Sequence, residues 1–240
     1  MSNYTIFISD LHLSPTEPEI TNLFLKFIED ISPTTDALYI LGDFFKFWVG
    51  DDDTSVFNEQ IKKALQLASS KTTIYLMSGN RDFILGQTFA KESGCILITD
   101  PYKIDLYQRP TLLTHGDILC TKDIKHRMFR AITRIPCGIS IFLKLPLTIR
   151  TWFARNLQKY SAKTKLSKDK NTMLPQISAI RKLMVKFDCN QIIHGHTHII
   201  ETEEFTVNDQ KMRRISLGEW TDHGSILIYH SDGQYEFKRI

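Results

Sequence analysis

Short apolar runs alternate with amphipathic segments along the first third of the chain. Runs of this kind fall at 4–9, 37–41 and 73–77. They are almost wholly apolar, which is typical of strands buried on both faces. Apolar residues at 20–31 and again at 56–68 recur every three to four positions and predict helices, and Thr16 and Glu19 have the spacing of a capping box before the first. Strand–helix–strand alternation predicts parallel pairing in a layered α/β core.

The pattern changes after residue 95. Short strands are predicted at 95–98, 102–106 and 111–114, and later at 191–193, 205–207, 213–217, 226–229 and 235–238. Asp232-Gly233 joins the last two as a hairpin turn. Between the two groups the chain has almost no strand signal and is predicted to be helical. We therefore divide it into a core (1–119), a basic helical lid insertion (120–187) and the rest of the core (188–240).

The composition is that of a soluble globular protein, with 42% hydrophobic and 24% charged residues. No apolar run is long enough to span a membrane. The four cysteines lack metal or redox spacing, and no secretory leader is evident, so we expect reduced thiols in the cytoplasm. The formal charge of +3 hides an asymmetry, because residues 120–186 hold 16 basic and two acidic residues. Such a segment favours contact with phosphate, nucleic acid or an anionic membrane surface over an ordinary solvated face.

Seven side chains with metal-binding groups follow separate predicted strands. They are Asp10, His12, Asp43, Asn80, His115, His196 and His198. Carboxylate, amide and imidazole donors without thiolates predict a site for two hard-to-borderline cations. The alternative is a set of loop caps and satisfied core histidines. His194 is either a core residue or a partner that orients a ligand.

The different donor types suit different roles in binding two cations. Asp43 has two oxygens and is able to bridge two ions, whereas Asn80 supplies a neutral oxygen. Two cations about 3.5–4 Å apart hold a bridging hydroxide and clamp the oxygens of a phosphoryl displacement. Arg81 is placed to bind phosphate oxygens, unless it forms a surface ion pair with Asp82. We predict catalytic roles for Asp43, Asn80, Arg81 and His115.

Five short motifs occur in a fixed order. They are D-x-H at 10–12, G-D at 42–43, G-N-R-D at 79–82, H at 115 and G-H-x-H at 195–198. Together they resemble the calcineurin-like metallophosphoesterases. The resemblance implies an α/β fold, a four-layer αββα sandwich. It also implies that Asp10, His12, Asp43 and His198 bind one cation, and that Asp43, Asn80, His115 and His196 bind the other.

Longer stretches narrow the resemblance. SDLHLSPTEPEIT, DALYILGDFFKFWVGDDD, GNRDFILG, HGDILCTKD and SLGEW are similar to a family of bacterial hydrolases in lipid A biosynthesis. That family cleaves the pyrophosphate of UDP-2,3-diacylglucosamine at the α-phosphorus, giving UMP and 2,3-diacylglucosamine 1-phosphate, with manganese, which implies two Mn²⁺ per chain. Its substrate contacts map to Asn80, Arg81, Asp123, Ser161, Lys165, Lys168 and His196. Lys165 departs from the family pattern, in which asparagine is expected.

The resemblance also accounts for the predicted insertion. Its apolar stretch at 135–149 is flanked by arginine and lysine, which suits a lid over acyl chains or an interfacial helix pair, although ordinary helix core is an alternative. We expect peripheral attachment to the cytoplasmic face of the inner membrane, through its anionic lipids, and no obligate protein partner. We expect no nucleic acid partner, because bases prefer aromatic platforms. The competing functions are another metallophosphoesterase, such as a nucleotide phosphodiesterase or dinucleoside polyphosphate hydrolase, and a non-catalytic membrane-binding protein.

Overall fold

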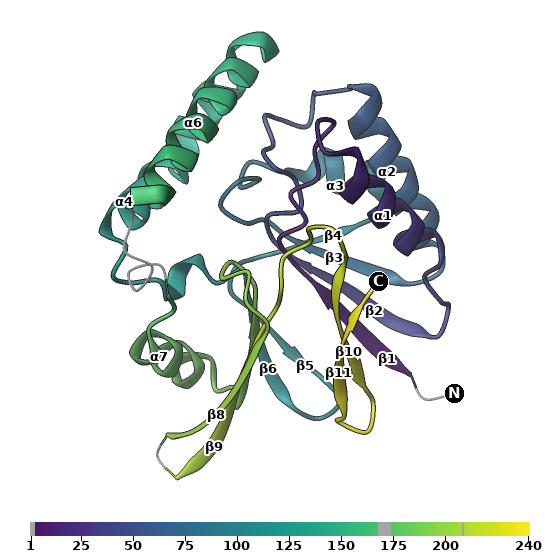
Figure 1. The fold of residues 1–240 in the computed structure, drawn as a ribbon, viewed down its shortest axis with the longest axis vertical. Coiled ribbons are helices and arrows are strands. Elements are labelled where there is room, and N and C mark those ends of the chain that lie inside the picture. The colour runs from purple at the N-terminus through teal and green to yellow at the C-terminus, as the bar shows by residue number, and fades with distance from the viewer. Residues whose placement is uncertain (1–2, 168–173, 208) are drawn as a thin grey trace.

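Two β-sheets packed face to face form the centre of the computed structural model, which describes residues 3–167, 174–207 and 209–240 (Figure 1). The first sheet has the strand order β11-β10-β1-β2-β3-β4 and the second β5-β6-β7-β9-β8. The strands are β1 (Tyr4–Ile8), β2 (Thr35–Leu41), β3 (Thr73–Met77), β4 (Ile96–Ile98), β5 (Tyr102–Asp105), β6 (Pro110–Thr114), β7 (Gln191–His194), β8 (Glu201–Val207), β9 (Gln210–Ser216), β10 (Ser225–His230) and β11 (Tyr235–Arg239). The helices are α1 (Pro18–Glu29), α2 (Val56–Ser69), α3 (Gln87–Ser93), the short 3₁₀ turn η1 (Asp117–Leu119), α4 (Ile124–Thr133), α5 (Pro136–Leu143), α6 (Leu147–Ser167) and α7 (Ile177–Phe187).

Three layers of buried side chains separate four layers of backbone. Alternate residues of β1 enter different layers: Ile6 and Ile8 face the helices α1–α3, and Phe7 faces the second sheet. In the second sheet, Ile193 of β7 joins the layer between the sheets, and Ile192 packs toward α7. A strand covered on both faces needs apolar residues at every position, which explains the unbroken apolar runs. The predicted αββα arrangement of two sheets and outer helices is confirmed.

Parallel strands bring the predicted motifs to one edge. β1, β2 and β3 are parallel neighbours in the first sheet, and β6 and β7 are parallel neighbours in the second. The carboxyl ends of parallel strands meet at the same edge of a sheet. The loops after these five strands therefore carry every motif residue to the same end of the sandwich.

The segment between β6 and β7 is helical, as predicted. α7 covers the second sheet through the buried side chains of Ile180 and Met184. α6 extends away from both sheets (Figure 1), and α5 lies against the first sheet's helical layer through Ile139 and Phe142. Among the described residues, none of the helices combines the length and hydropathy needed to cross a membrane. The predicted boundaries of the insertion, at residues 119 and 188, stay a prediction.

Local details differ from the sequence pattern. The capping box is wrong, because α1 begins with Pro18 in its first turn and Thr16 instead shares a hydrogen bond with Ser14. α3 was not predicted. β8 begins at Glu201 rather than at residue 205, because its first residues are exposed and polar yet pair with β9.

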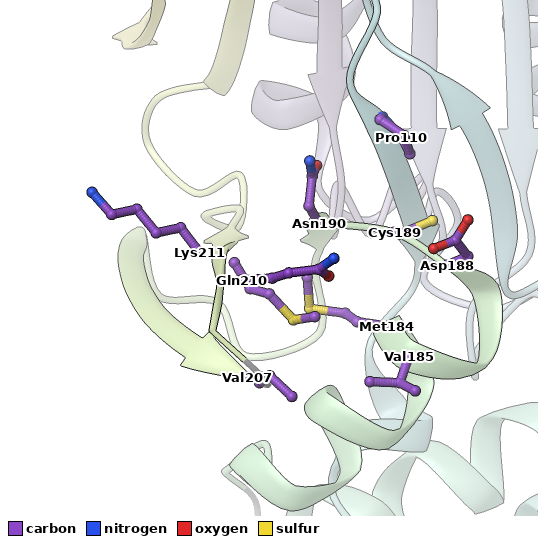
Figure 2. Close-up of a pocket in the computed structure, with 10 residues that line it drawn as sticks. Pro110, Met184, Val185, Asp188, Cys189, Asn190, Val207, Gln210 and Lys211 are labelled. Atoms are coloured by element: carbon purple, nitrogen blue, oxygen red, sulfur yellow. The ribbon is translucent and has the colours of Figure 1, made fainter.

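An open cavity of about 450 Å³ lies between α7 and the β8–β9 hairpin (Figure 2). Met184, Cys189, Lys211 and Pro110 are among the residues that line it. Pro110 starts β6, whereas His115 directly follows the end of that strand. The cavity is therefore at the opposite end of the sheet from the motif residues.

Candidate metal centre

The motif residues leave their strands through left-handed turns. The positive φ angles are 56° at Asp10, 53° at His12, 50° at Asp43, 69° at His196 and 63° at His198. This conformation costs an L-residue about 1–2 kcal/mol, and Asp and His tolerate it better than most. Five such residues around one point are an observation that favours a functional site, because strained backbone concentrates where it is needed for function.

The first cluster comprises Asp10, His12 and His198, with Asp43 beside them. The Nε2 atom of His198 lies 3.5 Å from Oδ1 of Asp10, and Nδ1 of His12 lies 3.9 Å from Oδ2 of Asp43. Oδ1 of Asp10 and both ring nitrogens of His12 are buried without a hydrogen-bond partner. Buried polar atoms normally have a partner, so these three unpartnered atoms fit the role of ligands to an electrophile such as a cation.

The second cluster centres on His115. Its Nε2 atom lies 3.0 Å from Oδ1 of Asn80, 3.3 Å from Nδ1 of His196 and 3.7 Å from Oδ1 of Asp43. Ligands bound about 2.0–2.2 Å from one ion lie about 3.0–3.6 Å apart. The donors of Asn80 and His196 therefore have the spacing of one coordination shell with His115, the Asp43 oxygen lies about 0.1 Å beyond that range, and Asp43 faces both clusters with different oxygens. The residues present fit two divalent cations.

Further groups hold the ligands in place. Oδ2 of Asp10 accepts hydrogen bonds from the Ser9 hydroxyl and the backbone N–H of His196, which ties the first motif to the last. Nδ1 of His115 lies 3.0 Å from the carbonyl oxygen of Leu41, so this nitrogen carries the proton and Nε2 is left to bind a metal. Nδ1 of His198 lies 2.5 Å from a carboxylate oxygen of Glu219. Glu219 follows the motifs in sequence and was not predicted as part of the site, although the stretch SLGEW contains it.

The buried carboxylate of Asp82 fixes the backbone of two loops of the site. One carboxylate oxygen accepts the backbone N–H of Gly79, and the other accepts those of Phe44 and Phe45. Burial, together with the charge of Asp43, raises the pKa of Asp82 to about 6. The alternative ion pair between Asp82 and its neighbour is wrong, because Asp82 points into the core.

The Arg81 side chain points to the site instead. Its Nε atom lies 3.3 Å from Oδ2 of Asp43, and its backbone N–H donates to Oδ1 of the same carboxylate. The Arg81 side chain is one-third exposed, so part of it remains accessible to an anionic ligand.

Two histidines of the site have raised pKa values. Burial acts to lower the pKa of His115, but the charges of Asp43 and Asp10 outweigh it and raise the pKa to about 9. Burial likewise opposes protonation of His198, but its contacts with the carboxylates of Asp10 and Glu219 raise the pKa to about 9. Without a cation, both imidazoles are therefore protonated at neutral pH and neutralise part of the carboxylate charge.

At three other histidines in or beside the clusters, the effect of burial is not outweighed. It lowers the pKa of His12 to about 4, of His196 to about 3 and of His194 to about 4. His194 joins neither cluster, since its Nδ1 atom contacts the carbonyl oxygen of Gly195 and its Nε2 atom is buried without a hydrogen-bond partner. We interpret His194 as a neutral core residue behind the ligands.

The predicted substrate contacts are only partly placed by the structure. Asn80, Arg81 and His196 lie in the second cluster or beside it. Asp123 is nearly buried and accepts the backbone N–H of His126 at the start of α4. Ser161 and Lys165 belong to the backbone of α6, but their side chains are outside the described part, and Lys168 lies outside the described residues.

α4 and its C-cap residue, Arg134, add side chains that sequence reasoning did not assign to the site. Nε of Arg130 donates to Oδ2 of Asp117 at 2.8 Å, and Arg134 donates to the carbonyl oxygen of Gly79, the residue before Asn80. The ring of His126 lies 5.6 Å from that of His196. No spacing rule links a residue on this helix to a loop some 50 positions earlier, so the sequence held no signal for these contacts.

Comparisons with known proteins agree with this geometry. The family model described as calcineurin-like phosphoesterase matches residues 4–199. The UDP-2,3-diacylglucosamine hydrolase of Aeromonas salmonicida is 42% identical over 93% of this chain and 89% of its own length. The proteins of the same name from Coxiella burnetii and Aliivibrio fischeri are 40% and 41% identical, each over 98% of this chain and 97% of the relative. Among solved structures, a novel archaeal phosphodiesterase is 15% identical over 99% of both chains with a TM-score of 0.51, which shows a shared fold.

Proposed function

The chain belongs to the calcineurin-like phosphoesterase family, and from that premise we propose that it hydrolyses the pyrophosphate bond of UDP-2,3-diacylglucosamine. The products are UMP and 2,3-diacylglucosamine 1-phosphate, as in lipid A biosynthesis. The relatives that match nearly the whole chain carry the name of that hydrolase. The structural observation that supports the proposal most is a basic helical segment with exposed apolar side chains beside the second cluster.

The two clusters would hold two Mn²⁺ ions, with Asp43 shared between them. When bound, the cations supply a water of lowered pKa and neutralise charge on the phosphoryl group. The chain's own residues position the substrate. The partly exposed guanidinium of Arg81 binds a phosphate oxygen beside Asn80, and it stays aligned because its backbone N–H is held by Asp43. His196 faces His115 across the same cluster and is able to contact the α-phosphate.

The helical segment accounts for recognition of the acyl chains. Exposed aliphatic and aromatic side chains line α4, α5 and α6, among them Met128, Ile132, Ile141, Trp152 and Phe153. Large exposed apolar side chains that gather on one surface are typical of sites that a ligand or a membrane covers. Phe142 packs partly against the core and also meets the ring of Phe153 at 6.5 Å, so it joins core and lid.

A substrate comparison tests the proposal. Purified protein loaded with Mn²⁺ is assayed with UDP-2,3-diacylglucosamine, with UDP-glucose, with a dinucleoside polyphosphate and with bis(p-nitrophenyl) phosphate. We expect the diacylated substrate to be hydrolysed, with release of UMP, at a far higher kcat/KM than any of the other three compounds, and we expect little turnover of any substrate after chelation. Higher kcat/KM for the dinucleoside polyphosphate would instead identify a nucleotide hydrolase, and absence of metal binding would favour a non-catalytic protein.

We further propose reversible attachment to the cytoplasmic face of the inner membrane. Residues 120–186 contain 16 basic and two acidic residues, and each basic residue near an anionic surface adds about 1 kcal/mol. Salt weakens that attraction, since the Debye length falls to about 3 Å at 1 M, whereas insertion of apolar side chains is insensitive to screening. Flotation with anionic and neutral liposomes across a salt series is the measurement. Binding that depends on neither lipid charge nor salt, or no binding, would leave the basic segment to serve the substrate alone.

A further inference from the structure

Arg150 is the one fully buried side chain among described positions 124–158, at 1% exposure. It lies in the first turn of α6, and its guanidinium reaches a loop of the core. Nη1 donates to the carbonyl oxygen of Val49 at 2.5 Å and to Oδ1 of Asp52 at 2.8 Å, and Nη2 pairs with the other oxygen of Asp52. Nε donates to the carbonyl oxygen of Leu145, just before the helix. Every nitrogen of the guanidinium is therefore used.

The core loop is shaped for this arginine. Gly50 has φ of 140°, and a Cβ atom there would collide with the guanidinium of Arg150. The next residue, Asp51, accepts hydrogen bonds from the Trp48 indole and from two backbone N–H groups at the start of α3. The loop is thus fixed to the core on one side and open to the arginine on the other. A lysine does not reproduce the two parallel hydrogen bonds to a carboxylate.

α6 amplifies any change at this contact. A helix rises about 1.5 Å per residue, so positions 161 and 165 lie about 16 and 22 Å along the axis from Arg150. A tilt of about 10° at the first turn would move position 165 by about 4 Å, which exceeds the length of a hydrogen bond. Among the described side chains of α6, those from 151 to 158 are exposed or half-buried, so they restrain the helix little.

We propose that the Arg150–Asp52 pair is a positioning latch, which sets the direction in which α6 leaves the core and so aligns the substrate-binding positions of that helix with the metal centre. Only the kinetic consequence of the latch depends on the proposed function. Its effect on the orientation of α6 is measurable without any substrate.

The kinetic test compares two variants that each remove one positive charge from α6. Arg150→Met breaks the latch, and Arg155→Met changes an exposed residue one turn further on as the matched control. Both are assayed as full-length, Mn²⁺-loaded protein. We expect Arg150→Met to raise KM for UDP-2,3-diacylglucosamine by about tenfold or more, because small misplacements of positioning groups have effects of that size. Turnover of bis(p-nitrophenyl) phosphate and Mn²⁺ affinity should stay unchanged in both variants.

The structural test measures the orientation of α6 directly. Nitroxide labels are placed at exposed positions of α2 and α6 through Lys63→Cys and Asn156→Cys, in a background with Cys137→Ser. The three remaining cysteines are buried. We expect one narrow distance distribution with the latch intact, a broad one with Arg150→Met, and a narrow one with Arg155→Met. A narrow, unshifted distribution in Arg150→Met overturns the proposal.

A second variant keeps the test decisive if Arg150→Met does not fold. Asp52→Ala removes the carboxylate partner of Arg150 at a position whose own side chain is 61% exposed, and it leaves the arginine bonded to two carbonyl oxygens. It should raise KM and broaden the distances in the same direction. The double variant should show the same KM and distance distribution as Arg150→Met alone, because the ion pair that Asp52→Ala removes is already absent from Arg150→Met. Additive effects of the two changes would contradict the latch. If the wild-type protein leaves UDP-2,3-diacylglucosamine intact, the proposed function fails, while the distance measurements still decide the latch.

Discussion

Glu219 offers a direct test of how the metal ligands are held. Its carboxylate lies 2.5 Å from Nδ1 of His198, whose Nε2 atom faces Asp10. Glu219→Gln keeps the shape and a hydrogen-bond acceptor but removes the charge. A hydrogen bond to a charged group contributes about 1.5–3 kcal/mol and a neutral one about 1 kcal/mol. The Glu219 side chain is 37% exposed, so solvent screening reduces the difference to about 1 kcal/mol, which corresponds to about fivefold weaker metal binding.

The assay is a titration of metal-free protein with Mn²⁺, in which binding is monitored by calorimetry or by the electron paramagnetic resonance signal of the free ion. We expect one of the two binding steps to weaken in Glu219→Gln, and turnover to recover at saturating Mn²⁺. Asp222→Asn is the matched control, because this exposed acid of the same loop pairs with His223 instead of a predicted ligand. Equal Mn²⁺ affinity in wild type and Glu219→Gln, or an equal loss in Asp222→Asn, would refute the reasoning.

Four more predictions follow from the candidate site and from the helical segment. Asp43→Ala removes a donor from both clusters and should lower turnover by at least about 10³-fold, with circular dichroism unchanged; near-normal activity of the metal-replete variant would sink the two-metal mechanism. Mn²⁺ binding at pH 7 should release about two protons, because His115 and His198 have pKa values of about 9 and bind metals only when neutral; calorimetry in buffers of different ionisation enthalpy measures this number, and no release contradicts it. The same raised pKa values stabilise the metal-free protein below pH 6.5, and this stabilisation is lost as pH rises through about 9. Phe142→Ser with Leu145→Ser should weaken hydrolysis of the diacylated substrate far more than that of a simple phosphodiester, whereas equal losses would indicate a general folding role.

The layered fold was predictable because each strand carries its own signal. A strand buried on both faces must be apolar at every position, and β1, β2 and β3 appear in the sequence as such runs. α3 escaped prediction because seven residues are too few to show a helical period. The start of α1 was misplaced for a local reason: Pro18 favours the first helical turn, which leaves Thr16 outside the helix.

The side chains of the candidate metal centre could be proposed from the sequence, whereas the groups that support them could not. Each ligand sits in a short motif directly after a strand, so local sequence is enough to propose it. Several of the groups that support these side chains come from segments that are distant in the sequence and close only in the folded structure. Asp82 adjoins Arg81 in sequence, yet its carboxylate turns inward to hold three backbone N–H groups. Arg150 meets Asp52 across 98 positions, a distance at which no local pattern carries information.

The pairing of β1 has a consequence for synthesis of the protein. β1 lies between β2 and β10, so one of its edges is completed only when residues 225–230 have been made. At about 5–20 residues per second, the ribosome needs about 10–40 s to travel from the first strand to the tenth. During that interval the apolar strand presents an unpaired edge, which is a template for association with other chains. A chain that stalls before residue 225 would therefore aggregate, and chaperones that shield strand edges should matter more for the yield of this protein than for its later activity.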